Sequence, residues 1–425
     1  MKSSLWLSAC VIAGSLAGGL VRAQPAEIPR GASAALPSAS GPAAGTVSLR
    51  TALDAAWQRA VAARESDGQR RRAEADRASA GSFWAAPPSL ALSHRDDRLQ
   101  SNAGKRETEI GVAVPLWLPG QRAARSGTVE AAVAQALAAE QAARLRLAGE
   151  VREAAWQLTA SQSELTQADT QAQALKQLAD DVERRVRAGD LARADALAAQ
   201  AEQWSASALQ SEARQRLQAA RARWTLLTGL IAGPDLSAAT PADAAPVGTS
   251  PHPELQLAGQ ARELARKRVE LMRHSRRDAP ELSVGVRQDV PGRAEGSQGS
   301  LVVGLRLPFG TDDRNRPLEA AALAELDVAE THEQRLRERI DSDIAAASDA
   351  QRSAETQLDA ETARAGLLRE RASLIDKSFR AGETPLPDLL RALAATAQAD
   401  SAVVRQTAAL GLARARLQQT LGLLP

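Results

Sequence analysis

The feature that most constrains this chain is an internal duplication, because local motifs recur in the same order about 193 residues further on. Pro88-Ser-Leu-Ala-Leu-Ser recurs as Pro280-Glu-Leu-Ser-Val-Gly, and Val186-Arg-Ala-Gly-Asp recurs as Phe379-Arg-Ala-Gly-Glu. Self-similarity at a fixed offset indicates one structural unit used twice. Any fold proposed for the first half must therefore also suit the second.

Each copy is predicted to follow one plan: a helix, two strands, a very long helix, a turn and a shorter helix. The first copy spans 48–231, with strands at about 88–117, and the second spans 253–425, with strands at about 280–309. Residues 232–252 contain four prolines and are predicted to be the linker between them.

Residues 1–23 are predicted to be a secretory signal peptide, with Lys2 as the basic region and an apolar run before Ala23. The Pro-, Ala-, Gly- and Ser-rich residues 24–47 are then predicted to form a flexible arm. Cys10, the only cysteine, leaves a second possibility open, because Leu7-Ser8-Ala9-Cys10 is similar to a lipoprotein cleavage box. Without Cys10 the mature chain has no thiol, which excludes disulfides.

Charge and composition further limit the functions and the kinds of fold that the chain can have. The chain has 53 Lys+Arg and 51 Asp+Glu, and removal of Lys2 and Arg22 with the signal balances the two. No basic footprint for nucleic acid remains. Aromatic residues make up only 2% of the chain, and the apolar part is mostly Ala and Leu, which favours long helices over a compact globule.

The helical segments carry a heptad pattern. In the segment 121–187, apolar residues recur seven apart from Val151 to Val186, which is typical of a coiled coil. In each copy the two shorter helices have roughly the combined length of the long one, so they are expected to lie end to end beside it. This arrangement suits the wall of a cylinder, an α-barrel, better than a globular bundle.

The segments 88–117 and 280–309 change to a period of two. Apolar side chains alternate there with small or polar ones, which gives four strands of about 10 residues, the length and pattern of outer-membrane strands. Aromatic residues at the strand ends suit either an aromatic girdle at a membrane interface or packing against the helices: Phe83, Trp84, Trp117 and Phe309. Because four strands cannot close a barrel, the chain is expected to oligomerise.

With these features the chain resembles the TolC-like outer-membrane efflux proteins. The resemblance covers about 48–424 and rests on the duplicated helix–hairpin–helix plan, on an Arg-x-Gly-x5-Asp pattern in both copies, and on the two Leu-Gly-containing repeat ends. It implies a mainly α protein with a β-barrel part: a trimer whose twelve strands form a membrane β-barrel and whose helices form a periplasmic α-barrel. It also implies two partners, a periplasmic adaptor and an inner-membrane transporter.

The candidate site residues follow from this resemblance. Arg187 and Gly189 in the first turn, and Arg380 and Gly382 in the second, are expected at the periplasmic tips, where the family's adaptor docks. The simpler interpretation of each glycine is a left-handed helix cap. Asp388 is expected two turns into the following helix, in an acidic ring at the closed entrance, with Asp195 as its counterpart and Arg391 as a pairing partner. Asp388 and Asp195 have a plain alternative as solvated helix residues.

No chemistry is predicted. The four histidines have no second His or Cys at ligand spacing, and phosphate loops and nucleophile motifs are absent from the sequence. We therefore predict no catalytic residue, no metal site and no cofactor. The expected function is a passive exit duct of a Gram-negative outer membrane that extends into the periplasm. A periplasmic adaptor and an elongated coiled-coil scaffold are the alternatives. The Leu-Pro-Gly-Gln-Arg sequence after Trp117 resembles the metal-cation efflux branch of the family.

Overall fold

The computed structural model describes residues 45–99, 101–237, 252–292 and 295–425. The signal peptide predicted at 1–23, most of the arm at 24–47 and most of the linker at 232–252 lie outside these ranges. The first half contains β1 (Val47–Ser48), α1 (Leu49–Arg59), α2 (Val61–Ala80), β2 (Ser89–Asp96), β3 (Arg106–Pro115), α3 (Gln121–Ala188) and α4 (Arg193–Thr228). The second contains β4 (Pro234–Asp235), α5 (Pro253–His274), β5 (Glu281–Val290), β6 (Gln298–Arg306), α6 (Asp312–Arg380) and α7 (Leu386–Thr420).

The predicted fold class is confirmed, because each half has long helices and one pair of antiparallel strands in the same order, which gives four strands in all. The helices α3 and α6 have 68 and 69 residues, so each is about 100 Å long. α1 and α2 have 11 and 20 residues and α4 has 36, which together nearly match α3. α5 and α7, with 22 and 35 residues, fall further short of α6.

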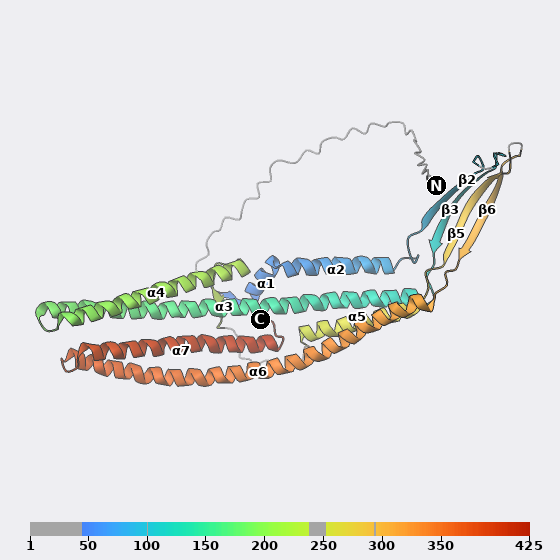
Figure 1. Cartoon of the computed structure of the whole chain (residues 1–425). Helices are drawn as coiled ribbons and strands as arrows, with labels where there is room; N and C mark the ends of the chain where they lie inside the picture. The colour runs from blue at the N-terminus through green and yellow to red at the C-terminus, as the bar shows by residue number, and fades with distance from the viewer. Residues whose placement is uncertain (1–44, 100, 238–251, 293–294) are drawn as a thin grey trace, which may run out of the picture. The chain divides into compact units, whose positions relative to one another are not determined.

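The helices pack as antiparallel pairs. α4 lies along α3 and α7 along α6, while α2 covers the other part of α3 and α5 lies between α3 and α6 (Figure 1). α3 also packs against α7, and this contact joins the two copies. Among the described residues, no helix is both long enough and apolar enough to cross a bilayer.

One sequence prediction was wrong where α1 meets α2, and a short ladder lies beside the same region. The single helix predicted ahead of the strands in the first copy is interrupted at Ala60, whose backbone is extended with φ −68° and ψ 138°. Val47 and Pro234, assigned to the arm and the linker, pair in a two-residue parallel ladder of β1 with β4. This ladder closes over an apolar core that includes the fully buried Trp224, whose indole N–H donates to the carbonyl of Ala232 at 3.0 Å.

The four long strands form one sheet in the order β2-β3-β5-β6, and every neighbouring pair is antiparallel. The two hairpins therefore meet along β3 and β5, and β2 and β6 are the sheet's edges. Figure 1 shows the sheet at the ends of α2, α3, α5 and α6. The register places residues from all four strands in straight rows across the sheet.

Candidate functional site

One face of the sheet is apolar and uncovered within the chain. The register aligns Leu90 with Val112, Val284 and Val303, and aligns Leu92 with Ile110, Val286 and Leu301. These side chains are exposed, from 45% at Val112 to 73% at Leu90. Soluble monomers rarely expose an apolar surface of this extent to water. The surface therefore marks a contact with lipid or with another protein.

The other face of the sheet carries small and charged residues. Gly111 pairs with Gly285, and a Cβ at Gly285 would lie 2.8 Å from the carbonyl oxygen of Ile110, so only glycine fits there. In the rows beyond, Glu107 forms ion pairs with Arg287 and, at 3.7 Å, with Arg95. The sheet thus has one face suited to lipid and one suited to water, as in outer-membrane strands.

The aromatic residues at the strand ends are only partly packed. Phe83 and Phe309 are 73% and 85% exposed, whereas the indole N–H of Trp117 donates to the carbonyl of Ser82 at 3.2 Å. Phe83 and Trp84 meet edge to face with ring centroids 4.5 Å apart. This hydrogen bond ties Trp117 to the segment that follows α2, whereas both phenylalanines are largely exposed to solvent.

Both predicted tip turns are Schellman motifs, the left-handed ending of a helix. The N–H of Asp190 donates to the carbonyl of Arg185 and that of Gly189 to Val186, at 2.9 and 3.1 Å. Residues 378–383 repeat this pair of bonds 193 positions later, each at 3.0 Å. Gly189 and Gly382 take φ of +92° and +81°, which glycine adopts without a Cβ penalty.

The two tips share one apolar core. Val182 and Ala199 from the first hairpin pack with Phe379, Leu386 and Leu389 from the second. The guanidinium of Arg185 also lies over the ring of Phe379, 5.1 Å from its centroid. The tips therefore present one continuous surface, on which Arg187 and Arg380 are exposed and Arg380 pairs with Asp376 at 2.9 Å.

The positions predicted for Asp195 and Asp388 need correction, because both lie in the first turn of their helices instead of two turns in. Ala192 and Pro385 are extended, with ψ of 152°, and delay the start of α4 and α7. The carboxylate of Asp195 accepts a hydrogen bond from the N–H of Ala192 at 3.2 Å, which is a helix cap.

Asp388 cannot make the equivalent bond, since Pro385 at the same position has no N–H. Its carboxylate instead forms an ion pair with Arg391, one turn later on α7. Asp388 is partly exposed, and Arg391 is largely exposed. The duplication thus places equivalent acids in both copies, and a single proline gives them different partners.

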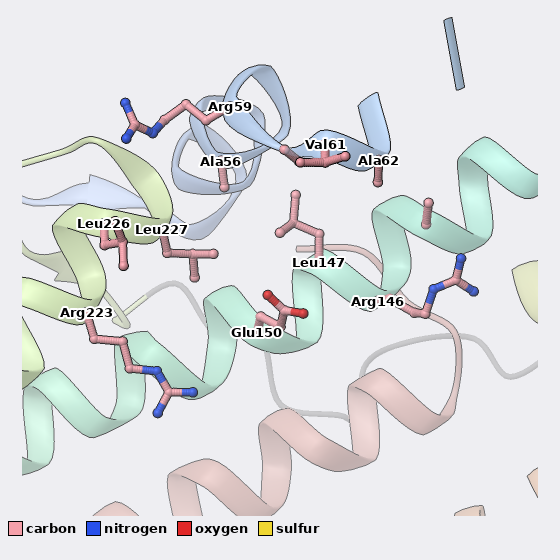
Figure 2. A pocket seen from close by; sticks show the side chains of 12 residues that line it. Ala56, Arg59, Val61, Ala62, Arg146, Leu147, Glu150, Arg223, Leu226 and Leu227 are labelled. Atoms are coloured by element: carbon pink, nitrogen blue, oxygen red, sulfur yellow. The ribbon is translucent and has the colours of Figure 1, made fainter. Parts of the chain in front are cut away.

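A pocket of about 790 Å³ lies where α1 and α2 separate above α3 and the end of α4. Figure 2 shows it lined by aliphatic side chains such as Leu147 and Leu226, with Arg59, Arg223 and Glu150 around them. The second copy has a smaller groove at the equivalent place, where Asp343 and Arg416 replace Glu150 and Arg223. This lining combines no nucleophile with a base, and the described residues contain no cluster of three potential metal ligands.

Sequence analysis missed the most deeply buried charge among the described residues. Arg152 of α3 is only 2% exposed, and it donates to the side-chain oxygen of Gln419 at 2.6 Å and to the carbonyl of Leu423 at 2.8 Å. Burial lowers the pKa of Arg152 to about 10. The residue ties the end of α7 to the long helix of the other copy, a contact that is visible only once the two copies are packed.

Comparison with known proteins supports the fold. No family model matches the chain, and no curated protein matches it in sequence. Among solved structures, the outer membrane protein VceC from Vibrio cholerae matches with a TM-score of 0.69 at 16% identity, covering 88% of this chain and 96% of VceC. The Campylobacter jejuni CmeC outer membrane channel matches with a TM-score of 0.70 at 14% identity, covering 88% and 85%.

A third structure, the outer-membrane channel OprN, matches with a TM-score of 0.72 at 18% identity and covers 88% of this chain and 89% of OprN. Three matches over nearly the whole of both chains show that this protein shares the fold of these outer-membrane proteins. The fold is that of the TolC-like channels, which confirms the resemblance drawn from the sequence.

Proposed function

We propose that the protein is an outer-membrane exit duct of a tripartite efflux system. The observation that carries this proposal is the sheet, whose exposed apolar face and charged opposite face belong to the same four strands. The duct conducts its substrate without chemistry, and the energy comes from an inner-membrane partner. The predicted signal peptide at 1–23 supports export to the outer membrane and periplasm.

The proposed assembly is a homotrimer. The edges β2 and β6 carry unpaired backbone groups, which lipid does not tolerate. If β6 of one copy pairs with β2 of the next, three copies close a twelve-stranded barrel. Exposed apolar residues seven apart on α4 and α6 support contacts of the same kind between the helices: Leu197 and Trp204, and Leu367 and Leu374.

The proposed adaptor site is the common surface of the two tips. Gly189 and Gly382 have open space where a Cβ would lie, so they shape the turns without filling the surface. Arg187 and Arg380 stand beside them and are exposed. Adaptor hairpins would pack against these turns, and the inner-membrane transporter would act through the adaptor.

Asp388 is the proposed entrance residue. In a trimer, three copies of this carboxylate near the tips would form an acidic ring that favours cations. Arg391 neutralises each carboxylate within its own chain, which supports a role in holding the ring closed. Asp195 is occupied as a helix cap, so its role in the entrance is secondary.

The alternatives suit the structure less well. A periplasmic adaptor would need one helical hairpin, whereas this chain has two, joined through α3 and α7. A soluble coiled-coil scaffold gives no reason for an exposed apolar sheet face. For cargo, we propose heavy-metal cations, and this rests on the Leu-Pro-Gly-Gln-Arg sequence that follows Trp117.

Cell fractionation combined with an export assay tests the function. The full-length protein should be recovered in the outer membrane, and deletion of its gene should sensitise cells to the cargo of the proposed inner-membrane transporter. Heavy-metal sensitivity supports the cargo proposal, and sensitivity to organic compounds alone contradicts it. Recovery as a soluble periplasmic protein contradicts the duct itself.

A further inference from the structure

Six arginines gather where the helices meet the sheet. Arg77 lies in the last turn of α2, Arg122 and Arg125 lie in the first two turns of α3, and Arg273, Arg276 and Arg277 lie at the end of α5. We call these six residues the arginine collar. All are exposed. They are far apart in sequence, and the contacts of α2 with α3 and of α3 with α5 bring their helix ends together (Figure 1).

The positive charge of the collar is largely uncompensated. Among the described residues, no carboxylate or hydrogen-bond partner contacts the guanidinium groups of Arg77, Arg125, Arg273, Arg276 and Arg277. Arg122 donates only to the carbonyl of Gly81, at 2.9 Å. Three nearby acids are paired with other arginines: Asp278 with Arg314, Glu281 with Arg306 and Asp312 with Arg316.

The collar borders the surface that the proposed function places in lipid. The exposed apolar rows of the sheet begin directly beyond these helix ends, and the exposed Phe83 and Phe309 lie between the two regions. From the sheet toward the helices, the surface changes from apolar side chains to aromatic rings and then to guanidinium groups. The same order, from acyl chains to interface to headgroup phosphates, runs through a phospholipid leaflet.

We propose that the arginine collar binds the headgroups of anionic phospholipids in the leaflet that faces the periplasm. Guanidinium groups present paired N–H donors that match the oxygens of a phosphate. A guanidinium without a carboxylate partner can donate both of them to a headgroup phosphate. Basic residues beside a membrane surface are attracted to anionic lipid. The proposal rests on the proposed function, because it requires the sheet to lie in the membrane.

Tryptophan quenching by brominated lipid measures this binding at the collar itself. Trp84 and Trp117 lie next to it, while Trp156 on α3 lies roughly 50 Å away along the helix. The purified mature protein is reconstituted in phosphatidylcholine that contains either brominated phosphatidylglycerol or brominated phosphatidylcholine. We expect phosphatidylglycerol to associate about fivefold more strongly, which corresponds to about 1 kcal/mol, and we expect 0.5 M NaCl to reduce the difference.

Matched variants separate a local effect from net charge. Replacing Arg273, Arg276 and Arg277 with Gln should lower the preference, Arg77→Gln with Arg125→Gln should also lower it, and all five replacements together should bring it close to one. The control carries the same charge change at three exposed arginines elsewhere on the helices and should keep the fivefold preference: Arg214, Arg371 and Arg405. Quenching of each variant by brominated phosphatidylcholine shows that it has inserted.

The outcomes distinguish the two proposals. Equal quenching of the wild-type protein by both lipids overturns the collar and leaves the duct standing. An equal loss of preference in the control variant also overturns it, because the effect is then one of net charge. No quenching by either lipid means that the sheet is not in the bilayer, which overturns both.

Discussion

Replacement of Gly382 by alanine isolates the conformational requirement of the second tip. Gly382 has φ +81°, and no atom lies within 4 Å of the position that a Cβ would take, so alanine there clashes with nothing. The cost is the left-handed backbone alone, about 1–2 kcal/mol. A penalty of this size raises the population of the opened turn about 5- to 30-fold.

Hydrogen exchange followed by mass spectrometry reads that population directly. Amides in the last turn of α6 and the first turn of α7 should exchange faster by that factor, while the trimer and its outer-membrane level stay unchanged. Gly366→Ala is the matched control, since Gly366 is also open to solvent on α6 but has helical backbone. It should stabilise α6 by roughly 1 kcal/mol. Unchanged exchange in Gly382→Ala would refute the reasoning.

Three further predictions follow from the site and the packing. Asp388→Ala should weaken block by divalent cations in a planar bilayer, and Arg391→Ser should raise open-state conductance; unchanged block would make Asp388 an ordinary solvated residue. Val303→Arg, on the apolar face of β6, should lower outer-membrane assembly by an insertion cost of about 2–4 kcal/mol, whereas Val302→Arg on the opposite face should assemble normally. Arg152→Met leaves the carbonyl of Leu423 unpaired and should destabilise the docked end of α7 by about 1–3 kcal/mol, measured as faster amide exchange there.

The tip glycines also bear on export. Gly382→Val adds a β-branched side chain in left-handed backbone and should misdirect the turn more strongly than alanine does. We expect this variant to lose export while its trimer and membrane level remain normal. Normal export by Gly382→Val would argue against adaptor docking at this turn.

The main elements were predictable because their patterns are long. A heptad pattern sustained from Val151 to Val186 in α3, and alternation of apolar with small or polar residues in most of β3 and β5, leave few other structures possible. The duplication added a second test of each element. Short features failed for the opposite reason: neither glycine nor proline marks the break at Ala60, and the two-residue ladder of β1 with β4 has no period to detect.

Some features of the candidate sites were predictable from the sequence and others were not. The left-handed caps at Gly189 and Gly382 follow from local sequence, since glycine is the residue that most readily adopts the left-handed backbone at a helix end. The different partners of Asp195 and Asp388 were also within reach, because Pro385 lacks the donor that Ala192 supplies. The arginine collar and the contacts of Arg152 were not, because they depend on which helices lie side by side.

The mass of the detergent-solubilised complex tests the central claim most directly. The protein is extracted from outer membranes in mild detergent, and its oligomeric state is measured by native mass spectrometry or light scattering with the detergent subtracted. The account predicts three copies of the mature chain, because four strands with open edges at β2 and β6 close only as part of a larger barrel. A monodisperse monomer that keeps its full helix and strand content would contradict it.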